Sequence, residues 1–130
     1  MTPTPVESWL HSADQDIAMA ALAIDAHINS QACFHAQQAA EKALKGFLLA
    51  RTGTYPKSHA LEQLLLFDTR DELREWRDRC RSLDVFYLPT RYPDAWPQGA
   101  FAEPAEAEAR TALDVARALL ADVRTRISKP

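Results

Sequence analysis

The chain has 130 residues, of which 47% are hydrophobic and 25% charged, so one domain over residues 1–130 with one modest core is expected. Its net charge of −3 excludes a global basic field for nucleic acid, and any such binding has to come from a local patch. No apolar run approaches the length of a membrane span, and no signal peptide opens the chain, which predicts a cytoplasmic protein. Alanine, the best helix former, is the commonest residue, which favours helices over a sheet.

The first predicted helix starts at Pro5 and ends near Asn29. Thr4 is a natural N-cap, Pro5 suits the first helical position, and Glu7 completes the spacing of a capping box. From Trp9 onward, apolar residues recur at helical steps.

A second helix is predicted over residues 31–51, and Gly53 is well placed to end it. Its apolar residues recur in alternating steps of three and four and form one buried seam: Cys33, Ala36, Ala40, Ala43, Phe47 and Ala50. The same helix carries small residues on more than one side, which permits close helix approach inside a bundle or across a two-fold axis.

Three more helices are predicted beyond the loop at residues 52–58. Ser58 is the expected cap of a short helix that carries Leu61, Leu64 and Leu65. Thr69 and Glu72 have the spacing of a second capping box, which predicts a fourth helix from there to Pro89. The apolar seam of this helix is Leu73, Trp76, Cys80, Leu83 and Tyr87.

The last helix is predicted to start around Pro104, with Glu103, Glu106 and Glu108 favouring its positive N-terminal end. The expected fold class is therefore all-α: an antiparallel up-and-down four-helix bundle with an additional short helix. The core is expected to contain Trp9, Phe47, Trp76, Leu83 and Leu120.

A polar stripe on the second helix is the first candidate site. His35, Gln38, Lys42 and Lys45 recur on the side opposite the apolar seam, and together they can reach one phosphate or nucleotide. The alternative is a solvated helix face, on which Glu41 pairs with Lys45 at the i, i+4 spacing.

The segment Arg91-Tyr92-Pro93-Asp94 is the second candidate. A proline-stiffened loop that holds Arg91, Tyr92 and Asp94 suits phosphate or base recognition. Alternatively, Arg91 and Asp94 bond each other and pin the loop across the helix ends. The two candidates combine into one hypothesis, in which the stripe and the loop converge on a single anionic ligand.

The sequence offers no candidate residues for a metal site or for covalent catalysis. The four histidines, His11, His27, His35 and His59, show no zinc spacing, so neither a metal nor another cofactor is expected. Cys33 and Cys80 lie on apolar seams, where the thiolate form is disfavoured, and they are interpreted as buried thiols.

Several strings of residues resemble the HEPN domain family. Residues 32–45, ACFHAQQAAEKALK, are similar to its signature second helix, and His59-Ala60-Leu61 with Leu64 is similar to its H-x-L segment. Tyr87 and the RYPD string at 91–94 resemble its RYPD loop, and the alanine-rich last helix fits as well. The resemblance covers nearly the whole chain.

The resemblance implies a bundle of four or five helices that usually forms homodimers and binds nucleotides or nucleic acid. It also implies, as partner, a separate minimal nucleotidyltransferase in a toxin–antitoxin-like pair. Many HEPN proteins are metal-independent ribonucleases in which an arginine is followed after four to six residues by a histidine.

This sequence departs from the ribonuclease motif. No histidine follows Arg91, and seven residues that include a proline separate Arg51 from His59. A binding role is therefore expected. One alternative is a ribonuclease in which His35 or His59 meets Arg91 in space, and another is a purely structural interaction module.

Overall fold

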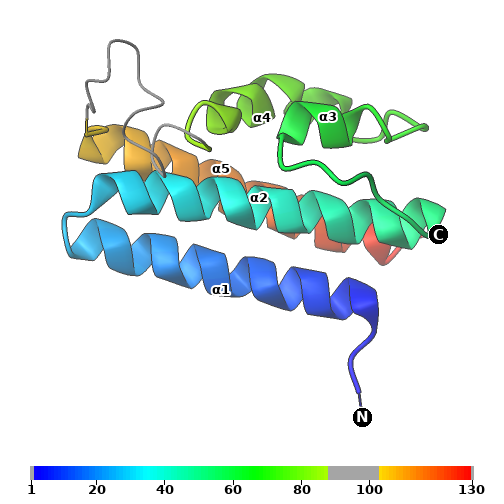
Figure 1. Ribbon diagram of the computed structural model, residues 1–130. Coiled ribbons are helices and arrows are strands. Elements are labelled where there is room, and N and C mark those ends of the chain that lie inside the picture. The colour runs from blue at the N-terminus through cyan, green and yellow to red at the C-terminus, as the bar shows by residue number, and fades with distance from the viewer. Residues whose placement is uncertain (1, 88–102, 130) are drawn as a thin grey trace.

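A computed structural model describes residues 2–87 and 103–129, and these ranges contain helices, turns and loops but no strand. Three long helices lie side by side: α1 (Pro5–Asp25), α2 (Asn29–Thr52) and α5 (Glu106–Ile127) (Figure 1). A layer of short elements covers α2 on another side: α3 (Leu61–Leu65), the 3-10 helix η1 (Arg74–Trp76) and α4 (Arg77–Asp84). The all-helical bundle predicted from the sequence is confirmed, although its fourth helix is short.

Helix α1 runs in the direction opposite to α2, whereas α5 runs in the same direction as α2 (Figure 1). At one end, the Asn29 side chain donates to the carbonyl of Pro104, and at the other the Arg51 guanidinium donates to the carbonyl of Arg126. These two contacts fix the register of α5 against α2.

Helix α2 is the centre of the molecule, because α1, α5 and the α3–α4 layer all pack against it. Fourteen of its 24 residues are buried, so it has far less solvent-facing surface than an ordinary amphipathic helix. Helix α1 packs tightly against Gly46, since a Cβ added there would lie 2.9 Å from a methyl carbon of Leu10. Any polar side chain on the buried sides of α2 must therefore find a partner within the protein.

The ends of the first two helices largely follow the sequence prediction. Thr4 and Glu7 form the capping box of α1, and Gly53 ends α2 in the left-handed conformation with φ +82°. Helix α1 ends at Asp25, earlier than predicted, because the turn passes through His27 at φ +61°.

The N-terminus of α2 is capped from a distant part of the chain. The backbone N–H of Ser30 donates to the carboxylate of Glu103 at 2.7 Å. Glu103, predicted to favour the N-terminal end of the last helix, thus has its carboxylate on the N-terminus of α2. At the N-terminal end of α5, the side chain of Glu108 accepts a hydrogen bond from the backbone N–H of Ala105.

The predicted capping box of Thr69 and Glu72 is also wrong. Asp71, between them, has φ +52°, which no helical first turn allows. The Glu72 carboxylate instead pairs with the Arg51 guanidinium of α2, at 2.8 Å from Nε. Helical structure therefore begins later, at η1, and α4 ends at Asp84, well before the predicted Pro89, which lies outside the described residues.

Helix α3 takes its cap from α4. The Asp84 carboxylate accepts hydrogen bonds from the backbone N–H groups of Leu61 and Glu62, at 2.8 and 3.0 Å. Ser58, the predicted cap, accepts only from the N–H of Ala60, one residue outside the helix. A five-residue helix is unstable alone, and this contact ties it to the C-terminal end of α4.

The core contains Phe47, Trp76, Leu83 and Leu120, as predicted. Trp9 does not belong to it: the indole is partly exposed and packs edge-on against Tyr55. Cys33 and Cys80 are buried, and this burial raises the pKa of each thiol to about 12, so the nucleophilic thiolate is scarce at neutral pH.

Replacement of Phe47 by alanine should lower the free energy of unfolding by about 3–5 kcal/mol, because a fully buried ring would leave a cavity between the helices. Urea denaturation measures this loss. Leu22→Ala, at a position 62% exposed on α1, is the control and should change stability by less than about 0.5 kcal/mol. A loss in Phe47→Ala as small as that of the control would contradict the described core.

Candidate functional site

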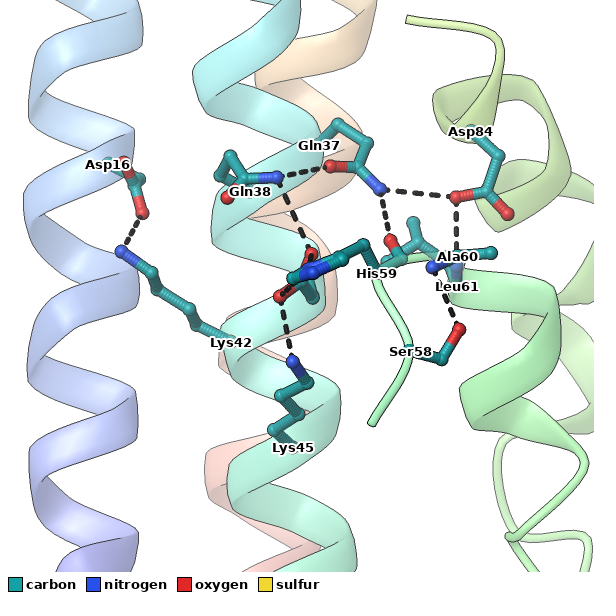
Figure 2. Close-up of polar contacts among 11 residues, drawn as sticks. Asp16, Gln37, Gln38, Lys42, Lys45, Ser58, His59, Ala60, Leu61 and Asp84 are labelled. Atoms are coloured by element: carbon teal, nitrogen blue, oxygen red, sulfur yellow. Dashed lines mark hydrogen bonds and ion pairs between the residues drawn. The ribbon is translucent and has the colours of Figure 1, made fainter. Parts of the chain in front are cut away.

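The partly exposed side of α2 forms a narrow polar strip between α1 and the segment that leads into α3. We call His35, Gln38 and Lys42 the α2 strip, because their side chains are the half-buried polar groups on this side of the helix. Figure 2 shows Asp16 of α1 along one edge of the strip and His59 along the other. His35, Gln38 and Lys42 thus share the partly exposed side of α2, whereas Lys45, the fourth residue of the predicted stripe, is buried.

Asp16 of α1 contacts two members of the strip, His35 and Lys42. Its carboxylate lies 2.9 Å from Nδ1 of His35 and 2.6 Å from Nζ of Lys42. Burial acts to raise the pKa of Asp16, but hydrogen bonds from His35 and Lys42, together with their positive charge, outweigh it and hold that pKa below 3.8. Asp16 is therefore ionised at neutral pH, and α1 and α2 are joined by a partly buried ion pair.

Glu41 is the second acid beneath this face. Its carboxylate accepts from Nζ of Lys45 at 2.9 Å and from Nε2 of Gln38 at 3.4 Å, and Nδ1 of His59 lies 3.3 Å from both of its oxygens. Asp16 and Glu41 therefore neutralise Lys42 and Lys45, the two lysines of the predicted polar stripe.

Lys45 differs from the other predicted site residues because it is buried. Its side chain is 8% exposed, its ammonium group pairs with Glu41, and the same group lies near the rings of Trp9 and Tyr55. These contacts use the charge of Lys45 inside the protein, as the i, i+4 pairing alternative anticipated.

Gln37 links the strip to the α3–α4 layer. This fully buried amide donates from Nε2 to the carbonyl of His59 at 2.9 Å and to the Asp84 carboxylate at 3.2 Å. Its own oxygen accepts from Gln38 at 2.8 Å. All polar atoms of Gln37 are thus engaged, and Figure 2 shows the chain of contacts running from the strip to α4.

The imidazole ring of His59 is held in place by Glu41 and is also exposed to solvent. The Glu41 carboxylate beside Nδ1 favours the proton on that nitrogen, so Nε2 is the ring nitrogen left for a ligand or a proton. The side chain is 62% exposed, and one face of the ring stacks on Tyr87 with centroids 5.5 Å apart and planes 15° from parallel. The sequence pointed to His59 only through its H-x-L resemblance, because periodicity cannot show that a loop histidine meets a helix glutamate.

The remaining predicted site residues, Arg91, Tyr92 and Asp94, lie outside the described residues, so their convergence with the strip stays a prediction. Within residues 2–87 and 103–129, no group of three or more histidine, cysteine or acidic side chains is arranged to hold a metal ion. In the same ranges no helix has the length and apolar character needed to cross a membrane.

Comparison with known proteins identifies the family. The profile of the HEPN domain matches residues 6–126, almost the full chain. The chain belongs to the HEPN family. Two solved structures are similar to this HEPN protein over most of their lengths. TT1696 from Thermus thermophilus is 38% identical with a TM-score of 0.82, and the match covers 92% of this chain and 96% of that one.

The second similar structure is ST0689, described as an archaeal HEPN homologue. It is 31% identical with a TM-score of 0.79, and the match covers 96% of this chain and 99% of that one. No curated protein matches the sequence.

Replacement of Asp16 by asparagine should lower stability by about 1–3 kcal/mol at pH 7, because His35 and Lys42 lose their charged partner. The depressed pKa means that wild-type Asp16 contributes stability above its unfolded value of 3.8, and that this contribution is lost as the pH falls through the folded value. The difference between wild type and Asp16→Asn should therefore shrink on acidification from about pH 6 to about pH 2.

Urea denaturation at several pH values measures this difference. Asp78→Asn, at a side chain 94% exposed, controls for the loss of a surface carboxylate. A gap between wild type and Asp16→Asn that stays constant across this pH range would contradict the ion pair.

Proposed function

We propose that this HEPN protein binds a nucleotide or nucleic acid through phosphate contacts at the α2 strip and His59. One observation carries the proposal: the acids of this site are buried beneath the nitrogen groups. The side chains of Asp16 and Glu41 are 11% and 5% exposed, whereas those of Lys42 and His59 are 26% and 62% exposed. An incoming anion therefore meets N–H donors and positive charge before it meets a carboxylate.

The buried acids also limit the strength of binding. Lys42 is already paired with Asp16, so a phosphate has to share or replace that contact. The strip alone would thus bind a phosphate with modest affinity. The residues of the RYPD loop would supply further contacts to the ligand. Arg91 would grip a phosphate through two parallel hydrogen bonds, Tyr92 would stack on a base, and Asp94 would orient Arg91.

Assembly is part of the proposal. HEPN membership supports a homodimer and a minimal nucleotidyltransferase partner in a toxin–antitoxin-like pair. The small residues of α2 lend no support to the dimer, since Ala32, Ala36, Ala39, Ala40 and Ala43 are all fully buried within one chain. Light scattering of the protein alone and with a co-expressed nucleotidyltransferase measures both associations.

A ribonuclease is the second candidate function, and the geometry of His59 favours it. A histidine whose Nδ1 is held by a buried carboxylate presents Nε2 as a general base or acid, which cleavage by 2′-hydroxyl attack requires. His35 suits this role less well, because its Nδ1 is bound to Asp16 and its side chain is only 24% exposed. RNA cleavage in the presence of EDTA that disappears in His59→Gln would establish this function.

Lys42→Ala and His59→Gln should each weaken binding of a fluorescent single-stranded RNA by roughly tenfold, the loss of one charge-assisted contact of about 1.5 kcal/mol. Binding should also weaken as salt rises, because phosphate contacts release counterions. Fluorescence anisotropy measures the affinity, with nucleoside triphosphates as competitors. Lys129→Ala, at an exposed lysine beyond α5, is the matched control and should bind as wild type does.

Unfolding is measured beside binding, since Lys42 also contacts Asp16. Variants that lose stability but keep wild-type affinity would show that the α2 strip is scaffold.

A further inference from the structure

An apolar hollow adjoins the α2 strip, close to the turn that joins α1 to α2 (Figure 1). Its volume is about 310 Å³, at the lower end of the roughly 300–1,000 Å³ that is typical of small-molecule sites. We call it the α1–α2 hollow, because its lining comes from these two helices and their turn: Met19, Leu22, Ala23, Ala26, Ile28, Gln31 and His35.

His35 makes the hollow and the strip one continuous surface. Its side chain lines the hollow, and Asp16 joins it to Lys42 farther along the strip. Because an α-helix rises about 1.5 Å per residue, Lys42 lies about 10 Å from His35 along the axis of α2. A ligand with a phosphate at Lys42 therefore reaches the hollow if a further group extends from that phosphate over about this length.

Three large apolar side chains of the hollow are presented to solvent. Met19 is 49% exposed, Leu22 is 62% exposed and Ile28 is 47% exposed. Six large apolar side chains are exposed in the described part of the chain, so half of them gather at this one hollow. None of the described residues that line it is acidic. An apolar group that covers these side chains gains free energy and meets no carboxylate of the lining.

The size and the lining favour a single aromatic ring over a protein surface. A stable protein–protein interface involves about 20–30 residues a side, whereas seven residues line the hollow. The Met19 thioether makes favourable contacts with aromatic rings, and the imidazole of His35 is a ring of the kind on which bases stack. The exposed amide of Gln31 offers a donor and an acceptor to the polar edge of such a ring. A nucleobase has both an apolar face and a polar edge.

We propose that the α1–α2 hollow holds one base of the nucleotide or nucleic acid whose phosphates contact the α2 strip. This inference rests on the proposed function and gives the ligand a direction, with the base beside Met19 and Ile28, the sugar near His35 and the phosphates towards Lys42. A nucleoside triphosphate, or a chain of two or more nucleotides, spans the distance of about 10 Å between His35 and Lys42 better than a monophosphate does.

The test compares ATP with inorganic tripolyphosphate, which has the same number of phosphates but no base. Each competes with a fluorescent single-stranded RNA for the full chain, and anisotropy measures the displacement. Tripolyphosphate carries at least as much negative charge as ATP, so stronger competition by ATP reports the nucleoside. ATP should compete about tenfold better in the wild type. Leu22→Ser and Gln31→Ala should each reduce this advantage by roughly threefold or more, whereas Lys42→Ala should weaken both competitors.

Matched controls replace the same residue types outside the hollow: Leu66→Ser after α3, 72% exposed, and Gln63→Ala at an exposed position of α3. Both should keep the full advantage of ATP, and circular dichroism should show the wild-type fold in every variant.

Three outcomes count against the inference. Equal competition by ATP and tripolyphosphate in the wild type would overturn it and leave phosphate binding at the α2 strip intact. An advantage of ATP that persists in both Leu22→Ser and Gln31→Ala, or that falls as much in the controls, would place the base elsewhere and also overturn it. If neither the RNA nor either competitor binds, the proposed function fails and the inference fails with it.

Discussion

The burial of α2 on nearly all sides is the constraint on which the rest of the structure depends. A helix at the centre of a small bundle normally carries only apolar residues, yet this one holds Gln37, Glu41 and Lys45 at 6% exposure or less. Buried polar groups cost free energy unless they are paired, so each of them must find partners inside the protein. Lys45 pairs with Glu41 of the same helix, whereas Gln37 and Glu41 find partners in the segment before α3 and in α4. These contacts join the α3–α4 layer to α2.

One line of contacts shows how this constraint positions a surface residue. Gln37 holds the backbone of His59 and the carboxylate of Asp84, while Glu41 holds the imidazole of His59. Asp84 in turn caps α3. The His59 ring is thus fixed from its backbone and from Nδ1, although most of its side chain faces solvent. An exposed group held in this way is suited to recognition, since less conformational entropy is lost when a ligand binds.

The helices could be predicted from local sequence patterns. The contacts between residues far apart in the sequence could not. The capping box of Thr4 and the glycine end of α2 were predictable because each depends on residues a few positions apart. Asp84 and Glu103 cap helices from 22 or more residues away, and the spacing of Thr69 and Glu72 misled because the backbone at Asp71 turns left-handed. At the site, periodicity placed His35 and Lys42 on one face, but it could not show that Asp16 lies beneath them.

We expect buried Glu41 to hold the exposed His59 ring with its proton on Nδ1. Long-range ¹H–¹⁵N correlation of the histidine rings at about pH 8.5, where imidazole is ordinarily neutral, measures this directly, with His59→Gln to assign the signals. His59 should show the Nδ1–H tautomer in the wild type and a shift towards the Nε2–H tautomer in Glu41→Gln. An Nε2–H tautomer in the wild type, or the same tautomer in both proteins, would contradict it.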